Sequence, residues 1–480
     1  MSTGNDSPAS GVSGRSPVRK AIWVAAAFIS VWLVTVLYWK ATYHVPSVKE
    51  LILNGVGVPL LLLAGIAGIR KGFAPAHRPA PSPEPRTVEA PAEVPGNDPS
   101  LTWTMALLDA SMRLPAGMNA EEVLALAREG KVVGLHPTLQ RLDGAKVFAG
   151  SAASIWGDDL DDGLLTLEVA ASWNDEQRRA MLLAAETIDE LMQRHATTPV
   201  TPPNDTRHAA PPPFKLHLLL PERWRADAST LAAWLDLHLE RGHWRPGVEP
   251  AKVIFTAHPV EALTALDALN LELHQQRSAV RHIVLACDSS LSQQTVNALD
   301  GAGQLFAHNR PNGHVLGEGA CALLLAQPMA AGTSDAAQVH RLVFAERPTS
   351  VDQPEQQQGD TVMGLLQKAL GQTENAELAM TGCALVSDAD QRSSRRAEIT
   401  DAAQQAWPDS DIRLRCQHLG FANGDSGAVL ALGTIAVAGA HSIEAQQPTF
   451  AVSISDPLVR GALLVSRPSS PDLVSSPPSA

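Results

Sequence analysis

Two long stretches without a charged side chain, both near the N-terminus, most strongly constrain how this chain folds. Residues 21–39 read AIWVAAAFISVWLVTVLYW, and these nineteen residues would form a helix long enough to cross the hydrocarbon core of a bilayer. Residues 51–69 (LILNGVGVPLLLLAGIAGI) form a second such stretch, whose glycines and Pro59 are tolerated in a span that packs against a neighbouring helix. We therefore predict a transmembrane hairpin over residues 21–71, preceded by a cytoplasmic tail over residues 1–20.

The charges that flank these stretches predict the orientation of the hairpin. Basic residues precede the first stretch and follow the second, whereas the turn offers Lys40 and Lys49, partly offset by Glu50. The positive-inside rule then places both ends, and the large domain, in the cytoplasm. If only the first stretch spans, the large domain lies outside instead. A secretory signal is disfavoured, because the apolar region is long and no small-x-small cleavage site follows it.

Proline-rich segments separate the remaining parts of the chain. Residues 72–100 are rich in Pro, Ala and Glu without apolar periodicity, which predicts an extended linker between membrane and domain. A second proline-rich break covers residues 197–213. The C-terminal residues 467–480 are predicted to form a disordered tail.

Overall charge and the cysteine pattern exclude several classes of function. The net charge of -13 argues against nucleic-acid binding, which requires a basic face. The four cysteines lie far apart and form no Cys-x-x-Cys pair, so neither a zinc site nor a redox dithiol is indicated. No His-Glu-x-x-His pair occurs either, and we expect neither a metal nor a cofactor.

Helical segments and short apolar runs alternate between residue 101 and residue 466. Asn174 and Gln177 match a capping box that opens a helix extending to about His195, and a second helix over residues 229–241 stops at Gly242. The runs KVIFTA, HIVLAC, ACALLLA and GAVLALG suit buried strands or tightly packed helices. This alternation favours an α/β sheet covered by helices.

Five stretches, taken in order, resemble segments of the β-ketoacyl synthases. Residues 253–269 (VIFTAHPVEALTALDAL) resemble the strand, sharp turn and helix of the nucleophile elbow. Residues 282–290 (HIVLACDSS) and 314–326 (HVLGEGACALLLA) resemble a strand-and-turn and the Gly-Glu-Gly-Ala turn that leads into an apolar strand. Residues 420–432 (GFANGDSGAVLAL) resemble the Gly-His-x-x-Gly-Ala-x-Gly-Ala stretch, and residues 450–466 resemble the last strand pair. Several matches in order are more specific than any single motif.

The resemblance implies a thiolase-like α/β fold, in which two similar halves pack as a five-layer α-β-α-β-α sandwich behind the N-terminal transmembrane helices. It assigns residues 101–272 to the N-terminal half, which has diverged most, and residues 273–466 to the C-terminal half. Because thiolase-like folds commonly dimerise, it also allows a homodimer.

The residues that carry ketosynthase chemistry in this family are replaced here. The elbow position, where the family has a cysteine nucleophile, falls on His258, and the second catalytic histidine aligns with Phe421. Residues 386–399, where the first histidine belongs, contain none, and residues 455–460 replace a glycine-rich turn. A thiolate nucleophile and two histidines are required for condensation. We therefore predict a pseudoenzyme with no catalytic residues, in which the four cysteines are buried structural thiols.

The stretch Gly424-Asp425-Ser426-Gly427 also matches the sequence around the nucleophile of chymotrypsin-like proteases. His258 would then be the partner of Ser426. The glycine and proline that normally follow are absent, and the α/β alternation disagrees with a β-barrel. We therefore expect Ser426 to be a small residue at a strand–helix junction.

Three short motifs and the hydrophobic N-terminus resemble the type VI secretion lipase adapter family of bacteria. The motifs read CDSSL (287–291), GQLF (303–306) and GEGA (317–320). This resemblance implies a non-catalytic adapter in the inner membrane, with the large domain cytoplasmic, that binds a lipase effector and delivers it to the secretion spike protein. Two alternatives stay open: a diverged β-ketoacyl synthase or acyltransferase of lipid or polyketide assembly, and a non-catalytic partner of an active ketosynthase.

Overall fold

A mixed sheet of eleven strands forms the frame of the large domain, and its order divides into two similar parts. The computed structural model describes residues 98–153, 172–195, 214–242, 249–276, 280–328, 336–353, 359–373 and 378–468, all of which belong to one compact unit. The predicted tail (1–20), transmembrane hairpin (21–71), most of the 72–100 linker and nearly all of the C-terminal tail lie outside these residues. Within the described ranges, every helix is too short or too polar to span a bilayer.

The first part of the sheet has the order β5-β4-β6-β7-β1. Strands β5, β4 and β6 are parallel to one another, whereas β7 is antiparallel to both β6 and β1. The strands are β1 (Met105–Arg113), β4 (Phe214–Pro221), β5 (Lys252–Thr256), β6 (Arg281–Ser289) and β7 (Glu318–Ala326). The apolar runs KVIFTA, HIVLAC and ACALLLA are therefore strands.

The second part repeats the same pattern in the order β11-β10-β12-β13, followed by β8 and β9. Strands β11, β10 and β12 are parallel, and β13 is antiparallel to β12, β8 and β9. The strands are β8 (Ala337–Val339), β9 (Val343–Glu346), β10 (Ala384–Ser387), β11 (Cys416–His418), β12 (Thr449–Ser453) and β13 (Val459–Ser466). Short β8 pairs with both β1 and β13 and so joins the two parts.

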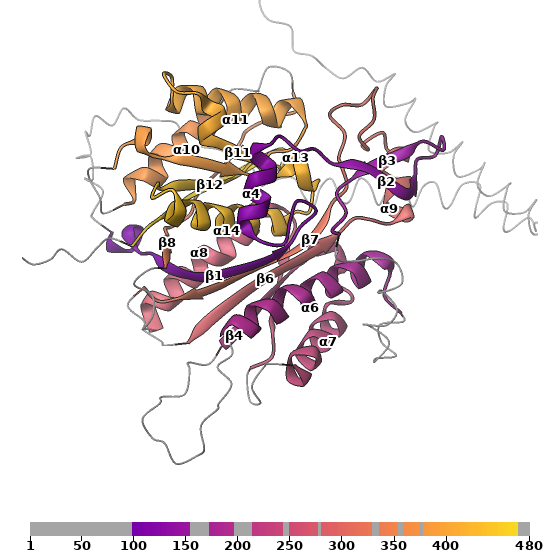
Figure 1. The fold of residues 1–480 in the computed structure, drawn as a ribbon, viewed down its shortest axis with the longest axis horizontal. Coiled ribbons are helices and arrows are strands. Elements are labelled where there is room, and N and C mark those ends of the chain that lie inside the picture. Colours follow the sequence, from indigo (N-terminus) through magenta and orange to yellow (C-terminus); the bar gives the residue numbers. More distant parts are fainter. Residues whose placement is uncertain are drawn as a thin grey trace, which may run out of the picture. The chain divides into compact units, whose positions relative to one another are not determined.

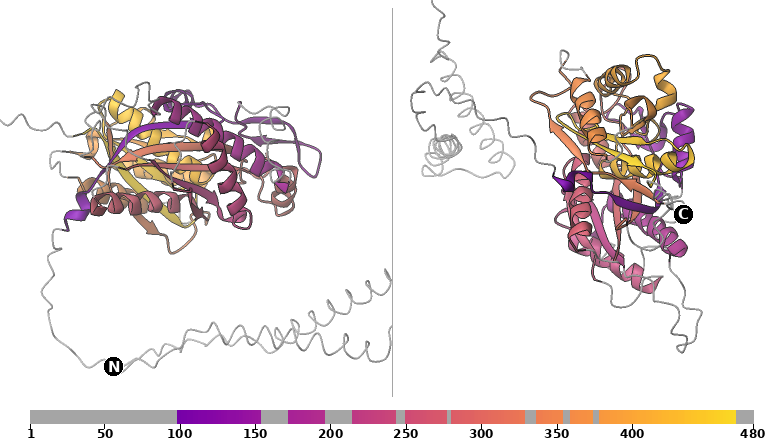
Figure 2. Two further views of the ribbon diagram at one scale, coloured as in Figure 1. Left: turned by 90° about the horizontal axis from the view of Figure 1, so that it is seen from below. Right: turned by 90° about the vertical axis from the view of Figure 1, so that its left-hand side faces the viewer.

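Helices cover both faces of each part of the sheet, and three hydrophobic cores separate the layers (Figure 1). Helices α8 (Pro259–Gln276) and α14 (Ala428–Glu444) pack together in the central core, with α4 (Ala120–Arg128) beside them. One outer core lies under α6 (Asp175–His195) and α7 (Ala228–Arg241). The other lies under α10 (Asp360–Gly371) and α11 (Ser393–Ala406). The layers, visible from two further directions in Figure 2, confirm the predicted α-β-α-β-α sandwich.

Smaller elements complete the described chain. A separate hairpin of β2 (Gly134–Gln140) and β3 (Lys146–Ala149) packs on α9 (Gln293–Gly301). The others are η2 (Pro99–Thr102), η4 (Glu222–Trp224), η5 (Met380–Gly382), α12 (Ile412–Arg415) and α13 (Gly420–Asn423).

The strand pairings place the border between the two halves later in the chain than the sequence predicts. Strands β6 and β7, which the sequence assigns to a C-terminal half over residues 273–466, belong to the first part of the sheet. The first half therefore extends to Ala326, and the second begins at Ala337 with β8. Strand β6 pairs with β4, and strand β7 pairs with β1. These pairings join segments that lie far apart in the chain, so the sequence of a single strand does not reveal them.

Local signals in the sequence predict several element ends correctly. The Asn174 N–H donates to Gln177 Oε1 at 3.1 Å, and the Gln177 N–H donates to Asn174 Oδ1 at 2.9 Å, which is the predicted capping box. Helix α7 ends at Gly242, as predicted. The run GAVLALG, left open between strand and helix, is the start of buried helix α14.

A buried pair of histidines makes the stability of this fold sensitive to acid. On neighbouring strands β4 and β6, His217 Nε2 lies 3.0 Å from His282 Nδ1, and the two rings are stacked. Burial, the largest effect, together with the nearby charges of Lys215 and Lys252 lowers the pKa of each imidazole to about 4, although the charge of Glu272 opposes the shift. Both imidazoles are therefore neutral in the folded protein near pH 7.

We expect the free energy of unfolding to fall as the pH is lowered below about 6.5, the usual pKa of histidine in an unfolded chain. Between that value and the folded pKa of about 4, the unfolded state binds more protons, so acid favours unfolding. Each histidine contributes a slope of at most about 1.4 kcal/mol per pH unit. Urea titrations between about pH 7 and pH 5 measure the slope, which should be shallower in a His217→Phe variant. An unchanged slope would contradict this explanation.

Candidate functional site

A cavity of about 370 Å³ lies between the two halves, at the carboxyl ends of β4, β5 and β6. The N-termini of the two central helices, α8 and α14, also reach it. In α/β sheets, ligands bind outside the carboxyl ends of strands, which makes this cavity the candidate site. Its polar lining consists of Arg223, Thr256, His258, Asp288, Ser290, His314, Asp352, Arg392, Arg395, Asp425, Ser455 and Asp456.

His258 occupies a sharp turn between a strand and a helix, as the resemblance predicted. Strand β5 ends at Thr256, and α8 begins at Pro259, whose fixed φ suits the first helical position. His258 Nε2 lies 3.6 Å from Glu261 Oε1, whereas Nδ1 is buried without a hydrogen-bond partner among the described residues. The geometry is that of a nucleophile elbow, with an imidazole in place of a nucleophilic thiol.

Phe421 lies apart from this cavity. It belongs to the short helix α13 and contacts the ring of His418 at a centroid distance of 6.0 Å, with the Arg396 guanidinium over its own ring. Burial lowers the pKa of His418 to about 4, and its Nδ1 lies 2.8 Å from Ser387 Oγ. The structure therefore brings His258 to the candidate site but does not bring Phe421 with it.

Ser426 does not form a catalytic triad. Its side chain is buried, and its Oγ has no hydrogen-bond partner among the described residues. It lies in the turn between α13 and α14, where Gly424 and Gly427 have positive φ values of 71° and 55°. Ser426 is thus a small buried residue at a junction, but the junction joins two helices and not the predicted strand and helix.

The loop after β10, where the family's first histidine was expected, carries a buried carboxylate instead. Asp388 Oδ1 accepts the N–H groups of Ile454 and Ser455, and Oδ2 accepts the hydroxyls of Ser453 and Ser455. Burial raises the pKa of Asp388, although these hydrogen bonds oppose the shift. Asp388 thus ties the β10 loop to the β12–β13 turn.

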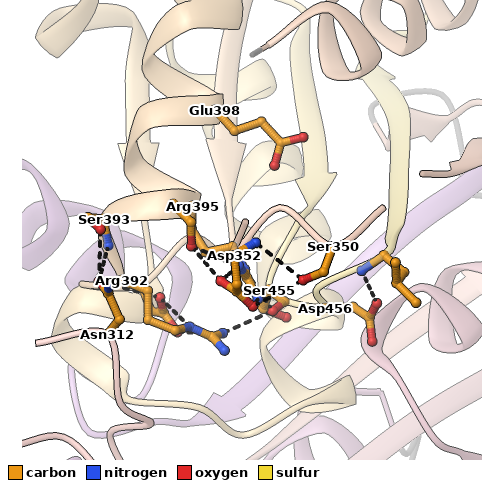
Figure 3. A network of polar contacts seen from close by, with 12 residues as sticks. Asn312, Ser350, Asp352, Arg392, Ser393, Arg395, Glu398, Ser455 and Asp456 are labelled. Carbon is orange, nitrogen blue, oxygen red and sulfur yellow. Dashed lines mark hydrogen bonds and ion pairs between the residues drawn. The ribbon is translucent and has the colours of Figure 1, made fainter. Parts of the chain in front are cut away.

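Two buried arginines fix the same turn from the other side (Figure 3). Arg392 donates from Nη2 to the Ser455 carbonyl at 2.9 Å, and it pairs with Asp390 at 2.7 Å. Arg395 donates from Nε to the same carbonyl at 3.1 Å and pairs with Asp352 at 2.5 Å. The turn between β12 and β13 is therefore held by charged groups.

Further charged groups face the cavity from the first half and from the α14 turn. Arg223 forms a two-pronged ion pair with Asp288. Asp425 Oδ2 lies 3.4 Å from His314 Nδ1, and Asp425 Oδ1 accepts the Gly427 N–H at 3.1 Å. Burial disfavours the charge on Asp425, but the hydrogen bond from His314 and the charge of Arg392 outweigh it and hold its pKa below the usual range.

None of the chain's four cysteines lines this cavity. All four lie in described residues and are buried as free thiols, as predicted: Cys287, Cys321, Cys383 and Cys416. Burial raises the pKa of every one, for Cys383 and Cys416 to about 12. Since the thiolate is the reactive form, none of them is activated as a nucleophile.

The charged groups of the cavity are the part of the site that sequence reasoning missed. Arg392, Arg395 and Asp390 lie in residues 386–399, the stretch in which the resemblance predicted a histidine. The signal available in the sequence was a group of charged residues directly after a buried strand. Their convergence with Asp425 and Asp288 depends on long-range packing, which no local pattern reveals.

Solved structures share this fold, although no protein-family model and no curated protein matches the chain. The ishigamide ketosynthase/chain length factor gives a TM-score of 0.53 at 18% identity, covering 76% of this chain and 99% of that chain. A type II polyketide synthase acyl-carrier protein in complex with its ketosynthase gives 0.53 at 11% identity, covering 76% and 99%. An oxazolomycin ketosynthase domain of Streptomyces albus JA3453 gives 0.52 at 13% identity, covering 77% and 75%. The large domain thus has the thiolase-like fold of ketosynthases, and at these identities the likeness concerns the fold alone.

Proposed function

We propose that this chain is a diverged ketosynthase-like protein that works by binding rather than by forming an acyl thioester. The observation that carries the proposal is the elbow: His258 occupies the turn before α8, and no thiol reaches the cavity beside it. Thioester formation needs a thiolate, and condensation further needs hydrogen-bond donors for the thioester oxygen. Such a protein could serve as a non-catalytic partner of an active ketosynthase.

Intact-mass spectrometry with an acyl thioester tests this proposal. The full-length protein is incubated with acetyl and hexanoyl thioesters beside an active ketosynthase as the positive control. We expect no covalent acyl group on this protein, because all four thiols are buried and protonated. A stoichiometric adduct on any cysteine would overturn the proposal and favour a diverged condensing enzyme or acyltransferase.

The finer role of a type VI secretion lipase adapter depends on the three short motifs and the expected membrane hairpin. Two of these motifs contact each other, since Ser290 of CDSSL accepts the Gly317 N–H and donates to its carbonyl, and in GQLF Leu305 is buried. These contacts account for the motifs as parts of the fold, and the similar structures are ketosynthases. Titration of the purified protein with a candidate lipase effector tests the role, and absence of a stable complex would remove it.

A further inference from the structure

We propose that the cavity beside His258 binds a small zwitterion, a molecule that carries both an ammonium and a carboxylate group. The inference rests on the proposed binding function and names the chemistry of the ligand. It follows from which charged groups of the cavity are already paired within the protein and which are not.

Each arginine that lines the cavity already has a carboxylate partner. Arg223 pairs with Asp288, Arg392 with Asp390 and Arg395 with Asp352. These pairs leave no net positive charge for a simple anion to neutralise. They also argue against a long acyl chain as the ligand, because an alkyl chain would displace water from charged groups without replacing its hydrogen bonds.

Two carboxylates of the lining have no such partner. Asp456 Oδ1 accepts the N–H groups of Leu458 and Val459, and no arginine or lysine in the described ranges lies within ion-pair distance of its carboxylate. Asp425 has only His314 as an ion-pair partner there. No group of three metal-binding side chains occurs among the described residues, so a ligand ammonium suits these carboxylates better than a metal ion.

One buried guanidinium offers a donor for the opposite charge. Arg392 is only 4% exposed, and its Nε and Nη2 atoms are occupied by Asp390 and Ser455. Its Nη1 makes no hydrogen bond to any described residue, as Figure 3 illustrates for the residues drawn there. A carboxylate would complete this set with a charge-assisted hydrogen bond. The buried Nδ1 of His258 is a second unsatisfied atom at the same cavity, and such atoms in folded proteins call for a missing partner.

The volume of about 370 Å³ is in the range of small-ligand sites and suits a molecule of amino-acid size. Isothermal titration of the full-length protein with the common L-amino acids and 4-aminobutyrate tests the proposal. We expect at least one of them to bind, and its matched amine and its matched carboxylic acid to bind about ten-fold more weakly or worse. For 4-aminobutyrate these controls are butylamine and butyrate.

Substitutions that keep the hydrogen bonds but remove charge identify the site. D456N keeps an oxygen for the Leu458 and Val459 N–H groups, and D425N keeps one for Gly427, so both should fold. Each is expected to weaken zwitterion binding about ten-fold. D411N is the matched control, because Asp411 accepts the Arg413 N–H outside the cavity, and it should leave binding unchanged.

Binding of no zwitterion, or equal binding of the zwitterion and its matched amine, would overturn this inference. So would binding that D425N and D456N leave unchanged. None of these results would affect the proposed absence of thioester chemistry, which the acylation experiment tests separately.

Discussion

A Glu398→Gln substitution is expected to destabilise the large domain by about 3–5 kcal/mol. Glu398 on α11 is fully buried and holds two arginines from other elements of the second half. It accepts from Arg347 Nη1 at 2.6 Å and pairs with Arg460 Nη2 at 2.8 Å. Removing its charge takes away the carboxylate that both buried guanidiniums contact, and losses of this kind are among the most costly single changes in a protein.

Urea unfolding monitored by circular dichroism measures this loss. Glu222→Gln is the matched control, because Glu222 forms a similar pair with Arg225 at 2.6 Å but on the surface, with the two side chains 49% and 58% exposed. Surface pairs contribute at most about 1 kcal/mol, so the control should unfold close to the wild type. If Glu398→Gln and Glu222→Gln lowered the free energy of unfolding equally, the stabilising role assigned to the buried Glu398 carboxylate would be wrong.

A Gly424→Ala substitution is expected to cost about 3 kcal/mol or more. Gly424 ends α13 with φ 71° and ψ −171°, a conformation that is essentially restricted to glycine. A Cβ atom there would also lie 2.3 Å from the Leu316 carbonyl oxygen, on the segment that leads into β7. The substitution therefore strains the backbone and forces the turn between α13 and α14 away from the segment that leads into β7.

Gly364→Ala is the control for this second substitution, and its effect should have the opposite sign. Gly364 lies inside α10, and a Cβ atom there would meet no neighbouring atom within 4 Å. Replacing a helical glycine by alanine in open space stabilises by roughly 0.5–1 kcal/mol. We expect the urea midpoint of Gly424→Ala to lie below that of the wild type and the midpoint of Gly364→Ala to lie above it. A Gly424→Ala variant as stable as the wild type would refute the prediction.

Local patterns predicted the parts of the fold that depend on a few neighbouring residues. The capping box of Asn174 and Gln177, the stop at Gly242 and the elbow before α8 all follow from short-range chemistry, and the structure has each of them. The five layers followed from resemblance, because their order is a property of the whole family rather than of any one segment.

Features that depend on strand pairing and side-chain convergence were not predicted. The border between the halves shifted because β6 and β7 pair with earlier strands. The resemblance aligned Phe421 with the second catalytic histidine of the family, whereas Phe421 lies beside His418 and Arg396 and does not line the cavity. Asp288 and Arg223 lie 65 residues apart in the chain, so their ion pair leaves no trace in a local window.

Acylation of an H258C variant measures whether a ketosynthase frame has lost its nucleophile at the turn before α8. A thiol at the start of α8 would have a lowered pKa, because the helix N-terminus stabilises the thiolate. Incubated with an acetyl thioester, the variant should gain one acetyl group, which peptide mapping should locate at position 258, while the wild type gains none. Acetylation of a native cysteine in the wild type, or an H258C variant that stays unmodified although its new thiol reacts with a small disulfide, would contradict the claim that a ketosynthase frame has lost its nucleophile at this turn.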